Sequence, residues 1–106
     1  MGRNDIATSR EMYELLEEQE FLCALTGQEL VCDENGDNSQ CDHKTPIKRG
    51  GTNDKKNLQW IRTEINAAKG TMTNEEFIEM CQRVVDWTSS TTPNVPAIMA
   101  GPPTTD

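Results

Sequence analysis

The segment from residue 40 to residue 70 constrains the fold of this chain more than any other part of its sequence. Short extended segments are expected at 40–43 and 58–61, separated by a loop that contains two consecutive glycines and has no apolar periodicity. A helix is expected from about residue 62 to residue 69, and the glycine that follows it suits a left-handed C-terminal cap. We therefore predict an α+β fold with a core of two short antiparallel strands and a helix.

Two further helices are predicted to flank this core. The first runs from about Ser9 to Phe21, and Thr8 with Glu11 forms a capping-box pattern at its start. The second runs from about Asn74 to Trp87 and has an apolar stripe at helical spacing, formed by Phe77, Ile78, Cys81, Val84 and Val85. We expect this stripe to pack on the core, which would make Cys81 a small buried apolar residue.

Residues 1–88 are predicted to form one domain, followed by a disordered tail at 89–106 that is rich in Pro and Thr. No apolar run approaches the ~20 residues of a membrane span, and no signal-like stretch follows the first residues. We therefore expect an intracellular, cytoplasmic protein with free thiols. The acidic stretch 33–38 contains an Asn-Gly turn, and as a calcium loop it would lack spaced ligands and a distal Glu.

Charge is divided unevenly along the chain. Residues 1–41 carry two arginines and ten acids, residues 42–69 carry seven cations and three acids, and residues 70–106 carry one arginine and five acids. The positive charge therefore coincides with the 40–70 segment, where it is suited to binding phosphates. The predicted nucleic-acid-binding residues are Lys48, Arg49, Lys55, Lys56, Arg62 and Lys69. The alternative is that these cations form an ordinary solvated surface.

The same segment contains the residue types of a metal-assisted phosphodiester hydrolase. The chain's only histidine, His43, follows Asp42, and Asn66 lies on the predicted helix beside the two cations Arg62 and Lys69. The Asp42 carboxylate and the Asn66 amide oxygen are suited to a hard divalent cation, and a neutral His43 imidazole can take the proton from an attacking water. The predicted roles are therefore metal ligands for Asp42 and Asn66 and general base for His43.

From about Cys23 to Gly70 the sequence resembles the HNH endonucleases, also called ββα-metal nucleases. The pair Asp42-His43 matches the first motif of the family, Asn57 matches the second and Asn66 the third, where many members carry histidine. The resemblance implies a DNA endonuclease of the sort found in mobile elements and bacteriophage genomes, with nicking of one strand and cutting of both left open. It also implies one divalent cation, Mg²⁺ or Mn²⁺ or another transition metal, and a structural role for Asn57 in holding the loop and orienting His43.

Two alternatives to a nuclease remain open. The first is a non-catalytic DNA-binding or assembly module that has kept the HNH fold. The second is an interaction domain stabilised by zinc, for which the available ligands would be Cys23, Cys32, Cys41 and His43. Of the two Cys-x-x-Cys pairs that hold structural zinc in several HNH proteins, only Cys23 is present, so structural zinc is not expected. The tail is a candidate site for a protein partner, and the target sequence and oligomeric state are left open.

Overall fold

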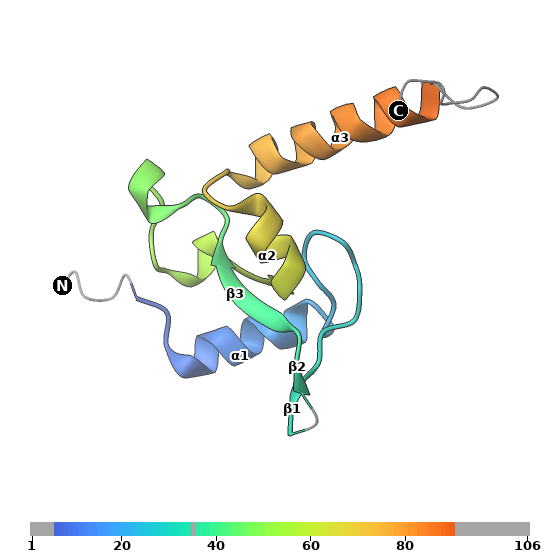
Figure 1. Cartoon of the computed structure of the whole chain (residues 1–106). Helices are drawn as coiled ribbons and strands as arrows, with labels where there is room; N and C mark the ends of the chain where they lie inside the picture. The colour runs from blue at the N-terminus through green and yellow to red at the C-terminus, as the bar shows by residue number, and fades with distance from the viewer. Residues whose placement is uncertain (1–5, 35, 91–106) are drawn as a thin grey trace. The chain divides into compact units, whose positions relative to one another are not determined.

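The computed structural model describes residues 6–34 and 36–90 of the 106-residue chain. The predicted α+β class is confirmed, since three α-helices and two two-stranded antiparallel sheets are present within these residues (Figure 1). The chain divides into two compact units, Met1–Asn74 and Glu75–Asp106. The predicted disordered tail lies almost entirely outside the described residues.

Helix α1 spans Ser9–Glu18 and begins with the predicted capping box, in which the Thr8 hydroxyl accepts from the Glu11 backbone N–H. It ends before Phe21, the predicted last residue, because Glu20 and Phe21 have φ angles of 56° and 59°. These left-handed backbone angles are unusual for residues other than glycine and cannot continue a right-handed helix. The amphipathic pattern therefore extends three residues beyond the helix itself.

A small hairpin follows, formed by β1 (Cys32–Asp33) and β2 (Gly36–Asp37). Of the predicted Asn-Gly turn, Gly36 begins β2 and is paired with Asp33, whereas Asn35 lies outside the described residues. The nearest pairing before β1 is an isolated antiparallel bridge between Leu22 and Glu29.

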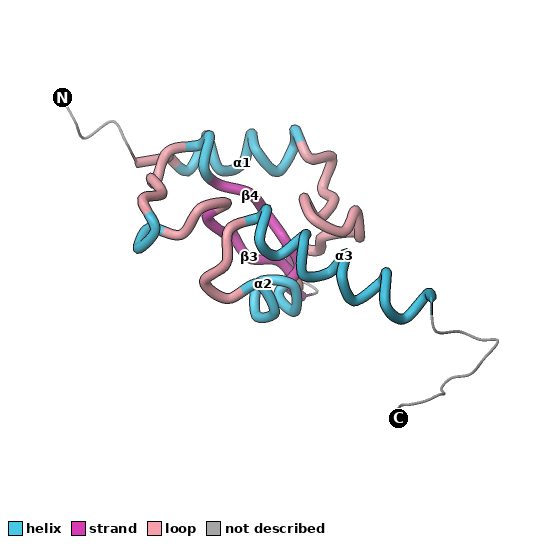
Figure 2. The backbone as a smooth tube through the Cα atoms, turned by 90° about the horizontal axis from the view of Figure 1, so that it is seen from above, coloured by secondary structure: helices cyan, strands magenta, loops and turns pink. Residues whose placement is uncertain are grey.

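The predicted ββα core is formed by β3 (Ser39–His43), β4 (Leu58–Arg62) and α2 (Thr63–Lys69). Strands β3 and β4 are antiparallel, and α2 begins directly after β4. Figure 2 shows α1 on one side of this strand pair and α2 on the other. Ile61 of β4 is fully buried in the core cluster that also contains Leu16, Cys23 and Leu30.

The loop between β3 and β4 contains two short 3₁₀ helices, Ile47–Arg49 and Lys55–Asn57. Gly50 ends the first of them with a φ of 96°, a backbone conformation that favours glycine. At Gly51 the chain passes so close to the backbone of Thr45 that a Cβ atom would overlap the Thr45 carbonyl. The two glycines therefore give this loop its compact shape.

Helix α3 spans Asn74–Ser90, so all but its first residue belong to the second unit, and it extends past the predicted end at Trp87. Only the start of its apolar stripe is covered, since Phe77 is buried whereas Ile78, Val84 and Val85 are exposed. Cys81 is also exposed, so the prediction that it is a buried apolar residue is wrong. Within the described residues, none of the helices combines the length and apolar character needed to cross a membrane.

Candidate active site

The carboxylate of Asp42 lies in a buried polar network between β3 and α2. Its Oδ2 atom is 2.9 Å from Nζ of Lys69 and 3.0 Å from Nε2 of Gln59, which donates a hydrogen bond to it. Gln59 faces Asp42 because the two residues are directly paired across the strands. The Gln59 amide also exchanges hydrogen bonds of 2.8 and 3.0 Å with the side chain of Asn74. Protein groups therefore already contact Oδ2 of this candidate metal ligand from two sides.

Lys69, predicted to bind phosphate, is one of the most buried residues of the structure, at 1% exposure. Besides its ion pair with Asp42, its Nζ donates to the backbone carbonyl of His43 at 2.8 Å. A side chain held in this way cannot lie on a phosphate-binding surface, and that prediction is wrong for Lys69. The sequence placed Lys69 on a polar helix face, but this face is covered by β3.

Two more of the predicted phosphate-binding cations are paired with acids. Arg62 is the last residue of β4 and the N-cap of α2, not a residue of the helix as predicted, and its guanidinium contacts the Glu64 carboxylate at 3.1 Å. Lys55 lies 2.7 Å from Glu18, and the hydrogen bond to that carboxylate raises the pKa of Lys55. Their charges are therefore partly balanced within the protein, and both are less available to DNA than the sequence suggested.

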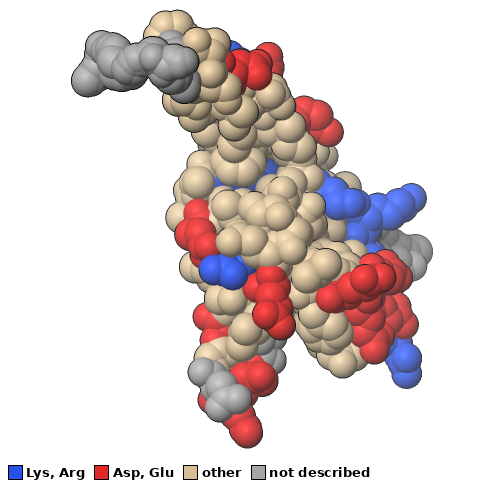
Figure 3. Space-filling model, turned by 90° about the vertical axis from the view of Figure 1, so that its right-hand side faces the viewer, with Lys and Arg blue, Asp and Glu red and all other residues tan. Residues whose placement is uncertain are grey.

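The remaining predicted cations, Lys48, Arg49 and Lys56, are exposed on the loop between β3 and β4. Arg49 donates to the backbone carbonyl of Thr71 at 3.4 Å, which leaves its side chain at the surface. In Figure 3, several Lys and Arg side chains gather at the right-hand edge of the face drawn, and acidic side chains form separate clusters, most of them on its lower half. Of the six cations predicted to bind nucleic acid, the exposed ones therefore lie on the loop between β3 and β4.

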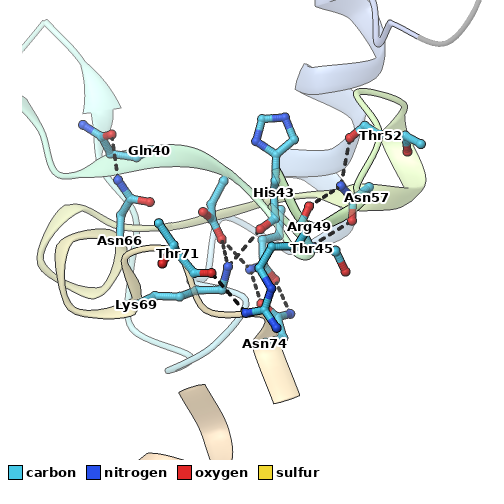
Figure 4. A network of polar contacts seen from close by, with 12 residues as sticks. Gln40, His43, Thr45, Arg49, Thr52, Asn57, Asn66, Lys69, Thr71 and Asn74 are labelled. Atoms are coloured by element: carbon cyan, nitrogen blue, oxygen red, sulfur yellow. Dashed lines mark hydrogen bonds and ion pairs between the residues drawn. The ribbon is translucent and has the colours of Figure 1, made fainter. Parts of the chain in front are cut away.

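The imidazole of His43 lies on the opposite side of β3 from Asp42, because side chains alternate along a strand. Its Nε2 is 2.8 Å from Oδ1 of Asn53, and the ring lines a cavity of about 220 Å³ together with Cys41, Leu58 and residues preceding and within α1. An amide oxygen can only accept a hydrogen bond, so in this contact Nε2 is the donor. Figure 4 shows the ring directed away from Lys69.

Asn66 lies on α2 where this helix faces β3, and its Nδ2 donates to Oε1 of Gln40 at 3.2 Å. Gln40 and Asp42 are two residues apart on β3 and so point to the same face of the strand. The structure therefore brings Asp42 and Asn66 to the same β3–α2 interface, while the His43 ring lies across the strand. A carboxylate oxygen and an amide oxygen are a chemically suitable, though incomplete, donor set for a hard cation, with water and phosphate as further ligands.

Asn57 holds the two ends of the loop together. Its Oδ1 accepts from the Thr45 backbone N–H at 3.0 Å, and its Nδ2 donates to the carbonyls of Thr45 at 2.9 Å and Thr52 at 2.8 Å. Its own backbone carbonyl accepts from the Lys44 N–H at 2.8 Å. Asn57 therefore fixes the backbone directly after His43.

The cysteines do not assemble into a metal site within the described part of the chain. Among the described residues, no three His, Cys, Asp or Glu side chains lie close enough together to hold a metal ion. Cys23 is buried, and its Sγ accepts from the Arg62 backbone N–H at 3.4 Å. Burial, together with the nearby Asp42 charge, raises the pKa of the Cys41 thiol. The Cys32 side chain, the remaining thiol of the four-ligand zinc alternative, lies outside the described part of the structure.

Three residues of the site were not predicted from the sequence: Gln59, Asn74 and Asn53. Gln59 had a usable signal, since it lies within a predicted strand that pairs with the strand containing Asp42. Asn53 and Asn74 belong to a loop and to a helix start, where the sequence gives no register. No protein-family model matches the chain, and no curated protein matches it.

Proposed function

We propose that this chain is a divalent-metal-dependent DNA endonuclease of the HNH type. The observation that carries the proposal is the order of elements and side chains in the β3–β4–α2 core. Asp42 and His43 end the first strand, Asn57 closes the following loop, and Asn66 faces β3 from the helix. This is the arrangement that the sequence resemblance implies for its three motifs.

In the proposed reaction, Asp42 and Asn66 hold the divalent cation by their side-chain oxygens. A cation held there would supply Lewis-acid stabilisation of the phosphate oxygens while the bond to the leaving 3′ oxygen breaks, and this oxygen would take a proton from solvent. His43, neutral and protonated on Nε2 by its contact with Asn53, takes the proton of the attacking water on Nδ1. Since His43 and Asp42 lie on opposite faces of β3, the scissile phosphate has to lie across the end of this strand to meet both groups.

The exposed cations Lys48, Arg49 and Lys56 bind the DNA backbone beside this position. They lie on the loop that leaves β3 directly after His43. The acidic surface elsewhere repels DNA, so contact is favoured at this loop.

The test is cleavage of supercoiled plasmid by the purified protein with Mg²⁺, with Mn²⁺ and with chelator. We expect nicked product with either metal and none with chelator. His43→Ala should lower the rate by about 10²- to 10⁴-fold, the usual effect of losing a general base, while DNA binding persists. Lys56→Met, an exposed loop residue outside the proton-transfer step, serves as the control and should keep turnover at saturating DNA. Full cleavage by His43→Ala would disprove the assignment of the base.

A non-catalytic DNA-binding module is the second candidate, and one observation favours it. Asp42 is paired with Lys69, and the His43 ring is directed into a largely apolar cavity on the other side of the strand. If the plasmid is bound but remains supercoiled with each metal, this second candidate replaces the first.

A further inference from the structure

Lys69 is buried and cannot bind phosphate at the surface, so its position needs a different explanation. Lysine is almost never fully buried unless its charge is paired, because removing an ammonium group from water is costly. Here the charge is paired with Asp42, and a second hydrogen bond goes to the His43 carbonyl. The last residue of α2 therefore binds the side chain of one candidate catalytic residue and the backbone of the next.

The ammonium group occupies part of the coordination space of the Asp42 carboxylate. The Oδ2 atom is contacted by both Lys69 and Gln59, at 2.9 and 3.0 Å. A carboxylate oxygen has two lone pairs, so these two donors engage both of them. A cation that binds Oδ2 must displace one of the two donors, and a cation near either oxygen is repelled by the ammonium charge.

We infer that Lys69 is a built-in counter-cation that neutralises Asp42 in the metal-free protein and competes with the divalent cation for this carboxylate. The inference rests on the proposed function only in taking Asp42 as a metal ligand. Its consequence is that Lys69 weakens divalent-metal binding while it stabilises the metal-free fold. The bond to the His43 carbonyl lets Lys69 stay in place as a positioning residue when Asp42 turns toward the metal.

The first test is calorimetric titration of Mn²⁺ into the wild-type chain and into Lys69→Met, which has a similar shape and no charge. Removing an adjacent positive charge should tighten Mn²⁺ binding on the order of tenfold or more. Lys56→Met removes the same charge from an exposed position and should leave the affinity within about twofold, because solvent screens exposed charges. Unchanged or weaker Mn²⁺ binding in Lys69→Met would overturn the inference.

The second test is thermal unfolding in chelator and in excess Mn²⁺. Lys69→Met leaves Asp42 buried without its counter-charge, so its melting temperature in chelator should fall below that of wild type. The rise in melting temperature on adding Mn²⁺ should be larger for Lys69→Met than for wild type, because the metal then supplies the missing charge. A gain equal to or smaller than that of wild type would contradict competition. The double variant Asp42→Asn/Lys69→Met lacks both charges. Its melting temperature in chelator should lie above that of Lys69→Met, and Mn²⁺ should not raise it more than it raises that of wild type.

Lys69→Gln covers the case in which Lys69→Met does not fold. Glutamine is uncharged but retains an N–H donor that is suited to the His43 carbonyl, and its Mn²⁺ affinity should also exceed that of wild type. The failure of this inference is distinguishable from failure of the proposed function. Plasmid cleavage by wild type with no tightening in either Lys69 variant overturns only the inference. If Mn²⁺ binds these variants more tightly but wild type does not cleave the plasmid, only the proposed nuclease function is overturned.

Discussion

Replacing Asn57 with alanine should destabilise the fold more than its half-buried position suggests. The side chain makes three hydrogen bonds to the backbone of Thr45 and Thr52, with lengths from 2.8 to 3.0 Å. Each such bond contributes about 0.5–1.5 kcal/mol, and water can replace part of this at a half-exposed site. We therefore expect Asn57→Ala to cost about 2 kcal/mol, which corresponds to roughly 8–16 °C in a domain of this size.

The assay is urea unfolding followed by far-UV circular dichroism, with thermal melting as a second measurement. Asn66→Ala is the matched control, because Asn66 is also half-buried but its side chain donates one hydrogen bond, at 3.2 Å to Gln40. It should cost about 0.5 kcal/mol. Asn57→Asp keeps an acceptor for the Thr45 N–H but places carboxylate oxygens against two carbonyls, so it should be at least as destabilising as Asn57→Ala. If Asn57→Ala costs no more than the Asn66→Ala control, the loop is not held by this side chain.

Three more outcomes follow from the site. Gly51→Ala should be strongly destabilising in urea titrations, because the added Cβ would overlap the loop backbone and only a shift of the loop relieves the contact. Asp42→Asn and Asn66→Ala should each weaken Mn²⁺ binding by calorimetry and lower cleavage, with partial rescue at high Mn²⁺; unchanged affinity in both would remove them as ligands. Lys56→Glu should raise the dissociation constant for DNA and flatten the salt dependence of binding. Lys55→Glu should have the same effect and should also lower the melting temperature, because the acids of α1 repel the new carboxylate. DNA-binding titrations and melting curves of both variants measure these effects.

The sequence predicted the elements of the core well because each has a local cause. The capping box of α1 is a short-range pattern and occurs where expected. Gly70 ends α2 at the expected position with a φ of 54°, but its ψ of −123° is not that of the predicted left-handed cap. Predictions that depended on long-range packing were less successful. The spacing of apolar and polar residues along α2 could not show that β3 covers the polar face of this helix. This contact with β3 is what buries Lys69. The stripe of α3 likewise has the spacing of a buried face, yet Cys81 is exposed.

The alternation of side chains along β3 also determines what catalysis by this chain would require. The Asp42 carboxylate and the His43 ring leave the strand on opposite faces, and a single phosphodiester can reach both only where the strand ends. The backbone at this end is held from two directions. Lys69 binds the His43 carbonyl, and Asn57 binds both backbone groups of Thr45, two residues further along. The precision of the proposed active site therefore depends on these two side chains as well as on the groups that would contact the phosphate, because a small shift of this backbone would move the base relative to the metal ligand.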